Sequence, residues 1–284
     1  MGKMKKARNI VLICFLLMGA GMFHSENAYA EKVGKYELSD TSPNCEYDVT
    51  GDGVKDTVEI KKMNESSYGS GYCGFKVIIN GKTALTDNTS WYYGLETIFI
   101  QTKGHGYFFI SLISEDDDGT MQIYKYIDGQ LKEVADLSKY TDKLFYHSSA
   151  TVTSVKSNSI TLRVVGQTDM LAYTNMSFTY KVGVDGKLSL KNKVTKVSYT
   201  NFRYSADKGS SYKSKYLVAA KKIQVYKKAT GTKKAFSIQK GTKLKIKKVS
   251  VQGKKPRYYC VTKSGKKGWI KSKYNLFKDT PYAG

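Results

Sequence analysis

The stretch "FKVIINGKTALT" (residues 75–86) decides the fold class of this chain. Two runs rich in apolar and β-branched residues flank the dipeptide Asn80-Gly81. Asn-Gly between two such runs is the strongest short-range signal of a β-hairpin, because both residues of the turn must adopt positive φ. The stretch therefore predicts two antiparallel strands joined by a two-residue turn.

Similar units recur along residues 31–200. "MQIYKYI" reaches "QLKEV" through Asp128-Gly129, and "MSFTYKVGV" reaches "KLSL" through Asp185-Gly186. Helical periodicity is nearly absent, and alternating runs predict further strands near 35–38 and at 56–61, 96–100, 107–113, 151–156 and 159–165. About a dozen short strands predict an all-β domain of antiparallel strands, arranged as an incomplete β-propeller or a sandwich.

The first thirty residues predict export. A basic start with three lysines and Arg8 precedes the apolar stretch "IVLICFLLMGAGMF" (10–23), and "AYA" at 28–30 has the small-x-small pattern of a signal peptidase site. The apolar stretch is shorter than the ~20 residues that span a membrane, and no later segment is long and apolar enough. We therefore expect residues 1–30 to be a signal peptide, a mature chain from Glu31, and no transmembrane segment.

Charge divides the mature chain into two parts. Residues 31–200 carry 19 Lys and Arg against 21 Asp and Glu, whereas residues 201–284 carry 24 against 2. Such an asymmetry indicates modules with different partners. The stretch 200–215 is polar and lacks apolar periodicity, so we expect a β domain at 31–199, a linker at 200–215 and a basic domain at 216–284.

The basic part favours an anionic partner outside the cell. At a Gram-positive envelope the leading anions are wall polymers such as teichoic acids and membrane headgroups, with extracellular nucleic acid as a weaker alternative. Only Arg203 and Arg257 are arginines in this part. Arginine reads bases and phosphates with a bidentate fork, whereas lysine acts as a diffuse point charge. The composition argues against specific nucleic-acid recognition, and a merely solubilising surface stays open as an alternative.

Three cysteines, Cys45, Cys73 and Cys260, remain after removal of the signal peptide. An odd number of cysteines in a secreted protein leaves either one free thiol or an intermolecular bridge. Cys45 and Cys73 flank the first β unit and either pair across it or stay unpaired. The role of Cys260 is open.

Oxygen-bearing side chains stand at alternate positions in "DVTGDGVKDTV" (48–58). This spacing is typical of a calcium loop, in which hard oxygen ligands surround the ion. The segment resembles the loop D-x-[DN]-G-D-G-x-x-D of FG-GAP and VCBS-type β repeats, with Thr50 in place of the usual Asp or Asn. The predicted ligands of one structural calcium ion are Asp48, Thr50, Asp52, Asp56 and the Val54 carbonyl. An Asx-rich turn without an ion is the alternative.

Residues 216–284 resemble a bacterial SH3 (SH3b) domain. The resemblance rests on "YLVAAKKIQVYKKA" (216–229), "FSIQKGTKLKIKKV" (236–249) and above all "RYYCVTKSGKKGWI" (257–270), in which a hairpin turn leads into a Trp strand. It implies a small SH3-like barrel that binds anionic cell-wall polymer or peptidoglycan. The aromatic side chains that we expect to line the ligand groove are Tyr226, Tyr258, Tyr259 and Trp269. Core packing is the alternative for each, since small β barrels fill their interiors with such residues.

Recognisable catalytic motifs do not occur in the sequence. Neither His105 nor His147 lies in a metal-binding spacing, and there is no G-x-S-x-G elbow. Carboxylates for glycoside cleavage would have to come from Glu96, Glu115 or Asp117. We therefore expect a secreted, non-catalytic, envelope-associated binding protein whose β domain presents a calcium-stapled surface to an unknown ligand. A cell-wall hydrolase or its regulator, targeted by the SH3b-like domain, is the alternative.

Overall fold

The structure is a computed structural model that describes residues 32–38, 45–65, 71–114, 120–141, 144–168, 170–171, 173–199 and 216–278. The signal peptide expected at 1–30 and the linker expected at 200–215 lie outside these residues. The described residues form twenty strands, paired antiparallel, and one four-residue helix. The all-β class that the sequence predicts is confirmed.

The first sheet contains the hairpin that decides the fold class. Its strands, in spatial order, are β2 (Cys45–Tyr47), β3 (Asp56–Lys62), β4 (Tyr72–Ile79) and β5 (Lys82–Tyr92). Between β4 and β5, Asn80 and Gly81 have φ values of 50° and 73°, as a two-residue hairpin turn requires. The predicted hairpin is confirmed.

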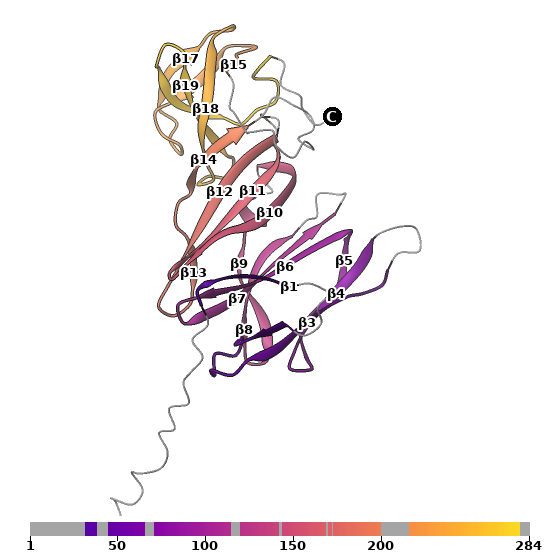
Figure 1. Cartoon of the computed structure of the whole chain (residues 1–284). Coiled ribbons are helices and arrows are strands. Elements are labelled where there is room, and N and C mark those ends of the chain that lie inside the picture. Colours follow the sequence, from indigo (N-terminus) through magenta and orange to yellow (C-terminus); the bar gives the residue numbers. More distant parts are fainter. Residues whose placement is uncertain are drawn as a thin grey trace, which may run out of the picture.

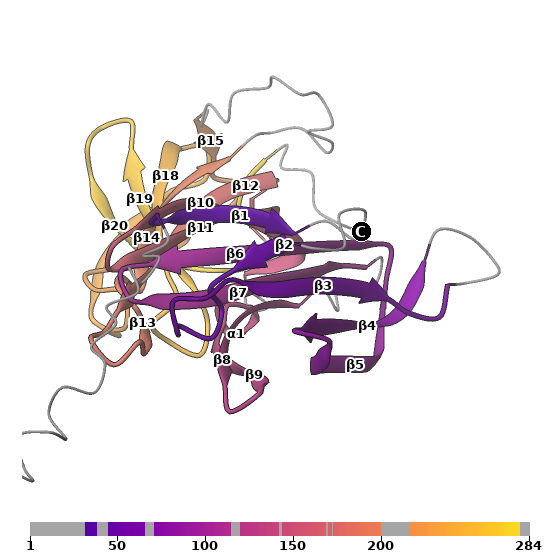
Figure 2. The same ribbon diagram turned by 60° about the horizontal axis from the view of Figure 1, so that its bottom comes forward.

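The middle sheet follows directly along the chain. Its strands, in spatial order, are β1 (Gly34–Leu38), β6 (Gly94–Thr102), β7 (His105–Ile113), β8 (Met121–Ile127) and β9 (Gln130–Asp136), and the short helix α1 (Ser138–Thr141) follows β9. Figure 2 shows β1 lying along β6, with which it pairs. Asp128 and Gly129 form the β8–β9 turn with φ values of 53° and 80°, so this hairpin is confirmed as well.

The large sheet begins in the second half of the N-terminal part. Its first strands are β10 (Phe145–Lys156), β11 (Ser159–Thr168), β12 (Tyr173–Val182), β13 (Leu188–Leu190) and β14 (Val194–Tyr199). The third predicted hairpin has a longer loop than expected, because the Gly183 N–H bonds to the Lys187 carbonyl and only Gly186 has positive φ. The Asp-Gly dipeptide therefore lies inside a wider turn.

The C-terminal strands continue the same sheet. They are β15 (Leu217–Val218), β16 (Ile223–Tyr226), β17 (Lys234–Ile238), β18 (Lys243–Ser250), β19 (Arg257–Thr262) and β20 (Lys267–Lys271). The order of the sheet is β10-β11-β12-β14-β18-β19-β20-β16-β17, with β13 on β12 and β15 on β18. Strands β15 to β20 form an open path, so the described residues do not close the small barrel that the SH3b resemblance implies. The reason is that the second edge of β18 is shared between β15 and β14.

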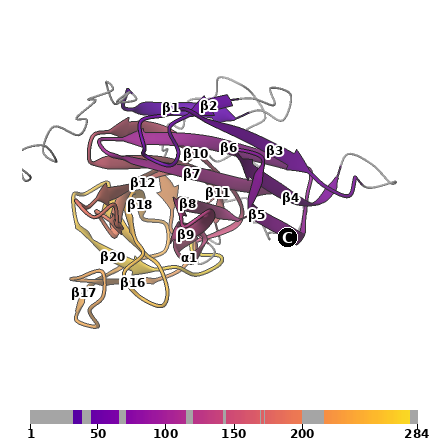
Figure 3. The same ribbon diagram turned by 90° about the horizontal axis from the view of Figure 1, so that it is seen from below.

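The middle sheet is buried on both faces. Phe99, Phe108 and Ile110 pack in the core with the first sheet. The alternate residues Ile98 and Phe109 pack in the core with the large sheet. The sheets therefore form three stacked layers, one more than the two-sheet sandwich that was one of the predicted arrangements. The first sheet and the C-terminal strands lie at opposite ends of the molecule (Figures 1 and 3).

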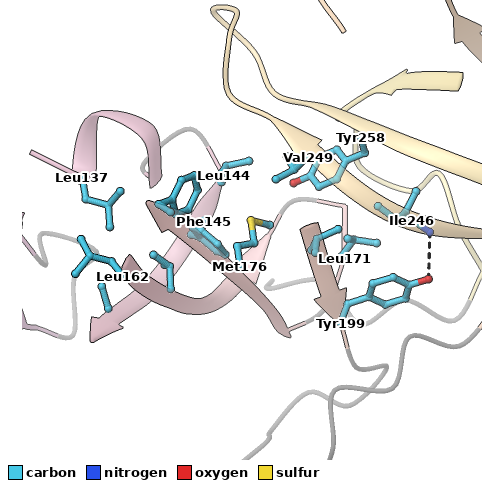
Figure 4. Close-up of a cluster of buried hydrophobic side chains, with 14 of the residues drawn as sticks. Leu137, Leu144, Phe145, Leu162, Leu171, Met176, Tyr199, Ile246, Val249 and Tyr258 are labelled. Atoms are coloured by element: carbon cyan, nitrogen blue, oxygen red, sulfur yellow. Dashed lines mark hydrogen bonds between the residues drawn. The ribbon is translucent and has the colours of Figure 1, made fainter. Parts of the chain in front are cut away.

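Strand β14 joins the two parts that charge and composition separate. Its residues 197–199 pair with 174–176 of β12, and its residues 194–196 pair with 248–250 of β18. Figure 1 shows β14 between β12 and β18. The hydrophobic core is continuous across this junction, where Leu171 and Met176 lie in one cluster with Val249 and Tyr258 (Figure 4). The strands on either side of segment 200–215 therefore share one sheet and one core.

Candidate functional site

An outward-facing aromatic row crosses three strands of the C-terminal part. Tyr226 on β16 lies directly opposite Trp269 on β20, and Trp269 lies directly opposite Tyr259 on β19. The rings of Tyr259 and Trp269 meet edge to face, with centroids 5.2 Å apart. All three side chains are partly exposed. Three of the four residues predicted to bind the wall are thus brought together on one face.

A glycine allows the row to form. A Cβ added to Gly268 would lie 2.4 Å from Cγ1 of Val225 and 2.9 Å from the carbonyl oxygen of Tyr226. Both distances are shorter than real Cβ contacts, so β20 can approach β16 this closely only with glycine at this position. The close approach places Trp269 beside Tyr226.

The prediction that Tyr258 lines the groove is wrong. Its side chain is fully buried and lies opposite Val249 and Ile270, on the core face of the sheet. Successive residues of a strand point to opposite faces, so Tyr258 and Tyr259 cannot both face a ligand. Core packing, the alternative for each aromatic residue, holds for Tyr258.

Two cations flank the aromatic row, and sequence reasoning did not assign them to the site. The guanidinium carbon of Arg257 lies 4.5 Å from the ring centroid of Tyr226, and Nζ of Lys271 lies 5.4 Å from the same centroid. Arg257 Nη1 also donates to the Gly231 carbonyl at 2.7 Å, which fixes the guanidinium over the ring. Arg257 stands two residues before Tyr259, so the alternation of the strand could have placed it on this face.

The electrostatic surroundings of this face are uniformly positive. Residues 216–278 contain 19 lysines, one arginine and no acidic residue. None of these residues takes part in an ion pair between side chains that the structure describes. Within residues 216–278 no acidic side chain offsets this positive charge, and such a concentration of charge attracts anions.

The loop predicted to bind calcium is held by bonds to its own backbone. The two carboxylate oxygens of Asp48 accept hydrogen bonds from the N–H groups of Gly51 (2.7 Å) and Gly53 (3.1 Å). Asp52 accepts one from the Val54 N–H at 2.8 Å. Gly51 and Gly53 have φ values of 81° and 87°, which fold the loop back on Asp48. This part of the loop forms successive Asx turns.

Asp56 has a different role from that of an exposed ligand. Its side chain is buried, with 3% of its surface exposed. One carboxylate oxygen accepts the N–H groups of Val49 and Thr50, both at 2.8 Å, and the other accepts the Asn80 amide at 2.6 Å. Among the described residues no group of three or more acidic, histidine or cysteine side chains is placed to hold a metal ion. Asp48, Asp52 and Asp56 thus each accept at least one backbone N–H of the loop itself.

The cysteines differ in environment. Cys73 is a free thiol, and Cys45 lies far from it, because Cys45 is opposite Val58, which is opposite Ile79. Six residues of strand separate Ile79 from Cys73, about 20 Å, whereas the Cα atoms of a disulfide are about 4.4–6.8 Å apart. The pairing of these two cysteines is therefore excluded in this fold. Cys260 is buried, and its burial raises the pKa of the thiol to about 12, which disfavours the thiolate form.

One carboxylate considered for catalysis lies beside a cavity. Glu96 lines a cavity of about 410 Å³ together with Glu37 and Lys62. It accepts a hydrogen bond from Thr151 Oγ1 at 2.8 Å, and its partial burial raises the pKa of the carboxyl above the ordinary value. Glu115 and Asp117 lie outside the described residues. His105 contacts the Val184 carbonyl at 3.1 Å, away from this cavity's lining residues.

The comparisons with known proteins give no relatives. No protein-family model matches the chain, and no curated protein and no solved structure matches it significantly. Within the described residues there is no helix with the length and apolar character that a membrane span requires.

Proposed function

We propose that this is a secreted, non-catalytic protein of the cell envelope, whose basic face binds anionic wall polymer or peptidoglycan. The observation that carries the proposal is the partly exposed row Tyr226, Trp269 and Tyr259, which lies within residues 216–278, a stretch without acidic residues. The signal-peptide pattern of residues 1–30 supports export. The lysine-rich composition supports binding to a repetitive polyanion rather than to a defined nucleic-acid sequence.

The chemistry of the face suits a charged glycan. Tyrosine and tryptophan present large apolar surfaces with a polar edge, which suits the C–H faces of sugar or polyol units. The surrounding cations attract phosphate or carboxylate groups over several ångströms, and salt screens this attraction. Aromatic contact would then fix the polymer on the face, while charge brings it there.

Sedimentation of the protein with purified cell wall tests the proposal. Trp269→Ala should weaken binding at least severalfold, because it removes the centre of the aromatic row. Trp91→Ala is the matched control, since Trp91 is also an exposed tryptophan but lies in the first sheet. Equal binding of both variants and the wild type would contradict a role for the row.

We also propose that the loop 48–56 takes up one structural calcium ion. The proposal is supported by the ligand spacing in the sequence and by the position of Asp48, which already accepts two N–H groups from the loop. Each carboxylate oxygen has two lone pairs, so these bonds leave acceptor capacity for a cation. The ion would stabilise the connection of β2 with β3 and have no role in catalysis.

The alternative, a wall hydrolase or its regulator, is supported by one observation. Glu96 has a raised carboxyl pKa beside a cavity, as a general acid for glycoside cleavage would need. Zymography on purified wall separates the two functions. Clearing by the wild type that is lost in Glu96→Gln would favour the hydrolase, whereas binding without clearing favours the adaptor.

A further inference from the structure

The aromatic row continues into the N-terminal part of the chain. Tyr259 lies directly opposite Lys248 on β18, and Lys248 lies directly opposite Lys196 on β14. Residues directly opposite each other in antiparallel strands point to the same face of the sheet. The row therefore contains one residue from each of five neighbouring strands: Tyr226, Trp269, Tyr259, Lys248 and Lys196.

The end of this row belongs to the part of the sequence that charge analysis assigns to the other module. Lys196 precedes the segment 200–215, whereas Lys248 follows it. The two lysines meet only because β14 pairs with β18. Both side chains are exposed, so the face is accessible at this end. The pair of Lys196 and Lys248 therefore forms only when the N-terminal and C-terminal parts share one sheet.

Pairs of like charge on this face point to a ligand. Lys196 stands opposite Lys248, and Arg257 stands opposite Lys271. Like charges directly opposite in a sheet destabilise it. No acidic residue in 216–278 relieves either pair. An anion that lies between the paired cations would remove the repulsion.

The arrangement of the cations indicates a chain-like anion. Neighbouring strands are ~4.8 Å apart, so the row from Tyr226 to Lys196 spans about 19 Å. Arg257 and Lys271 lie at the Tyr226 end of the row and the two lysines lie at the other end, with Tyr259 and Trp269 between them. A linear polymer with repeated phosphates can meet both cation pairs while its uncharged units cover the rings.

We propose that a linear phosphodiester-linked polymer of the envelope lies across strands β16 to β14 along this row, and that Lys196 is part of its binding site. This inference rests on the proposed envelope-binding function and adds a ligand class and a path. Lysines suit such a polymer because they act as point charges with flexible stems and need no fixed phosphate geometry. Single-stranded nucleic acid also combines phosphates with stacking units, and the test separates it.

The test uses the full mature chain and poly(glycerol phosphate) as the probe, with binding measured at low salt. Lys196→Glu should weaken binding about three- to tenfold, because one exposed ion pair is lost and a repulsion replaces it. Lys240→Glu is the matched control, since Lys240 is exposed in a turn between β17 and β18 and lies outside the row. It should weaken binding less than twofold.

Lys196→Gln distinguishes a binding role from damage to the fold. It removes the repulsion from Lys248, so the variant without polymer should melt at the same temperature as the wild type or higher. It should nevertheless bind the polymer more weakly. A lower melting temperature together with weaker binding would overturn the assignment of Lys196 to the site.

Three outcomes are distinguishable. If the wild type binds the polymer and Lys196→Glu and Lys240→Glu weaken this binding equally, the proposed path of the polymer along the row is wrong. The proposed envelope function is then left intact. Absence of wild-type binding to the polymer, with binding to whole wall retained, would overturn the ligand class. Tighter binding of an oligonucleotide of equal charge, dependent on Lys196, would replace the wall polymer by nucleic acid and overturn the proposal.

Discussion

The hydroxyl oxygen of Tyr199 accepts a hydrogen bond from the backbone N–H of Ile246, at 3.4 Å (Figure 4). Tyr199 is the last residue of β14, and Ile246 lies in β18 beside the bulge between Ile246 and Lys248. Both side chains are buried. The bond therefore joins the N-terminal and C-terminal parts inside their shared core.

Substitution of Tyr199 should affect the whole protein. Tyr199→Phe removes one hydrogen bond and should lower the free energy of unfolding by about 1 kcal/mol. Tyr199→Ala also leaves a cavity and should lower it by about 3–5 kcal/mol. Calorimetry should record one cooperative transition in each protein, shifted to lower temperature in the variants. If calorimetry records two transitions and Tyr199→Ala lowers the temperature of only one, the two parts unfold independently.

Asp56 should be the residue of the 48–56 loop that matters most for stability. Asp56→Ala leaves the Val49 N–H without its acceptor in a buried setting and the Thr50 N–H without its acceptor in a partly buried one. We expect a loss of about 2–4 kcal/mol in the free energy of unfolding, measured by urea denaturation in the presence of chelator. Asp52→Ala is the control, because Asp52 is exposed, and should stay within about 0.5 kcal/mol of the wild type.

Calcium should raise the stability of the wild type. At ten times its dissociation constant, an ion that binds only the folded chain adds about 1.4 kcal/mol by mass action. Thermal melts with calcium and with chelator measure this difference, and Asp52→Ala should reduce it, since one carboxylate ligand is lost. Identical wild-type melts in the two buffers would leave the loop as a set of Asx turns without an ion.

Glu96 should make the protein less stable as the pH rises. Burial raises the pKa of its carboxyl in the folded state above the ordinary 4.5. Between these two pKa values the folded state binds more protons than the unfolded state, so stability falls with rising pH and stays lower above the folded pKa. Glu96→Gln keeps an acceptor for Thr151 and should melt higher than the wild type at pH 7.

The effect of Glu96→Gln on the melting temperature should depend on pH, whereas that of a surface variant should not. The difference in melting temperature between Glu96→Gln and the wild type should shrink as the pH falls below 4.5, where the carboxyl is protonated in both states. Asp128→Asn is the control, because the Asp128 side chain is 82% exposed and lies in the β8–β9 turn. A pH-independent difference for Glu96→Gln would contradict the role of its burial.

Local signals in the sequence were sufficient for much of the fold. Asn80-Gly81 and Asp128-Gly129 predict their hairpins because positive φ at both turn residues is a property of the turn itself. The alternation of β19 could likewise have separated Tyr258 from Tyr259. Asp185-Gly186 predicted too short a turn, because the loop is closed by the hydrogen bond between Gly183 and Lys187, which lie outside the dipeptide.

The junction could not be predicted from local signals. Strand β14, "VTKVSY", is short, and its partner strand β18 begins more than forty residues later, beyond a polar segment that reads as a linker. The burial of Asp56 could not be predicted from the sequence either. Its carboxylate accepts hydrogen bonds from Val49, Thr50 and Asn80, which approach it only in the folded chain. Both features depend on tertiary contacts that spacing does not encode.

We propose that the mature protein binds the envelope through charge and the aromatic row. The most direct measurement is the fraction of mature protein that sediments with purified Gram-positive wall as sodium chloride is raised from low concentration to 1 M. The screening length falls from ~10 Å at 0.1 M to ~3 Å at 1 M salt. We expect strong binding at low salt and release as the salt rises. No sedimentation at low salt, or binding that 1 M salt leaves unchanged, would contradict binding through charge.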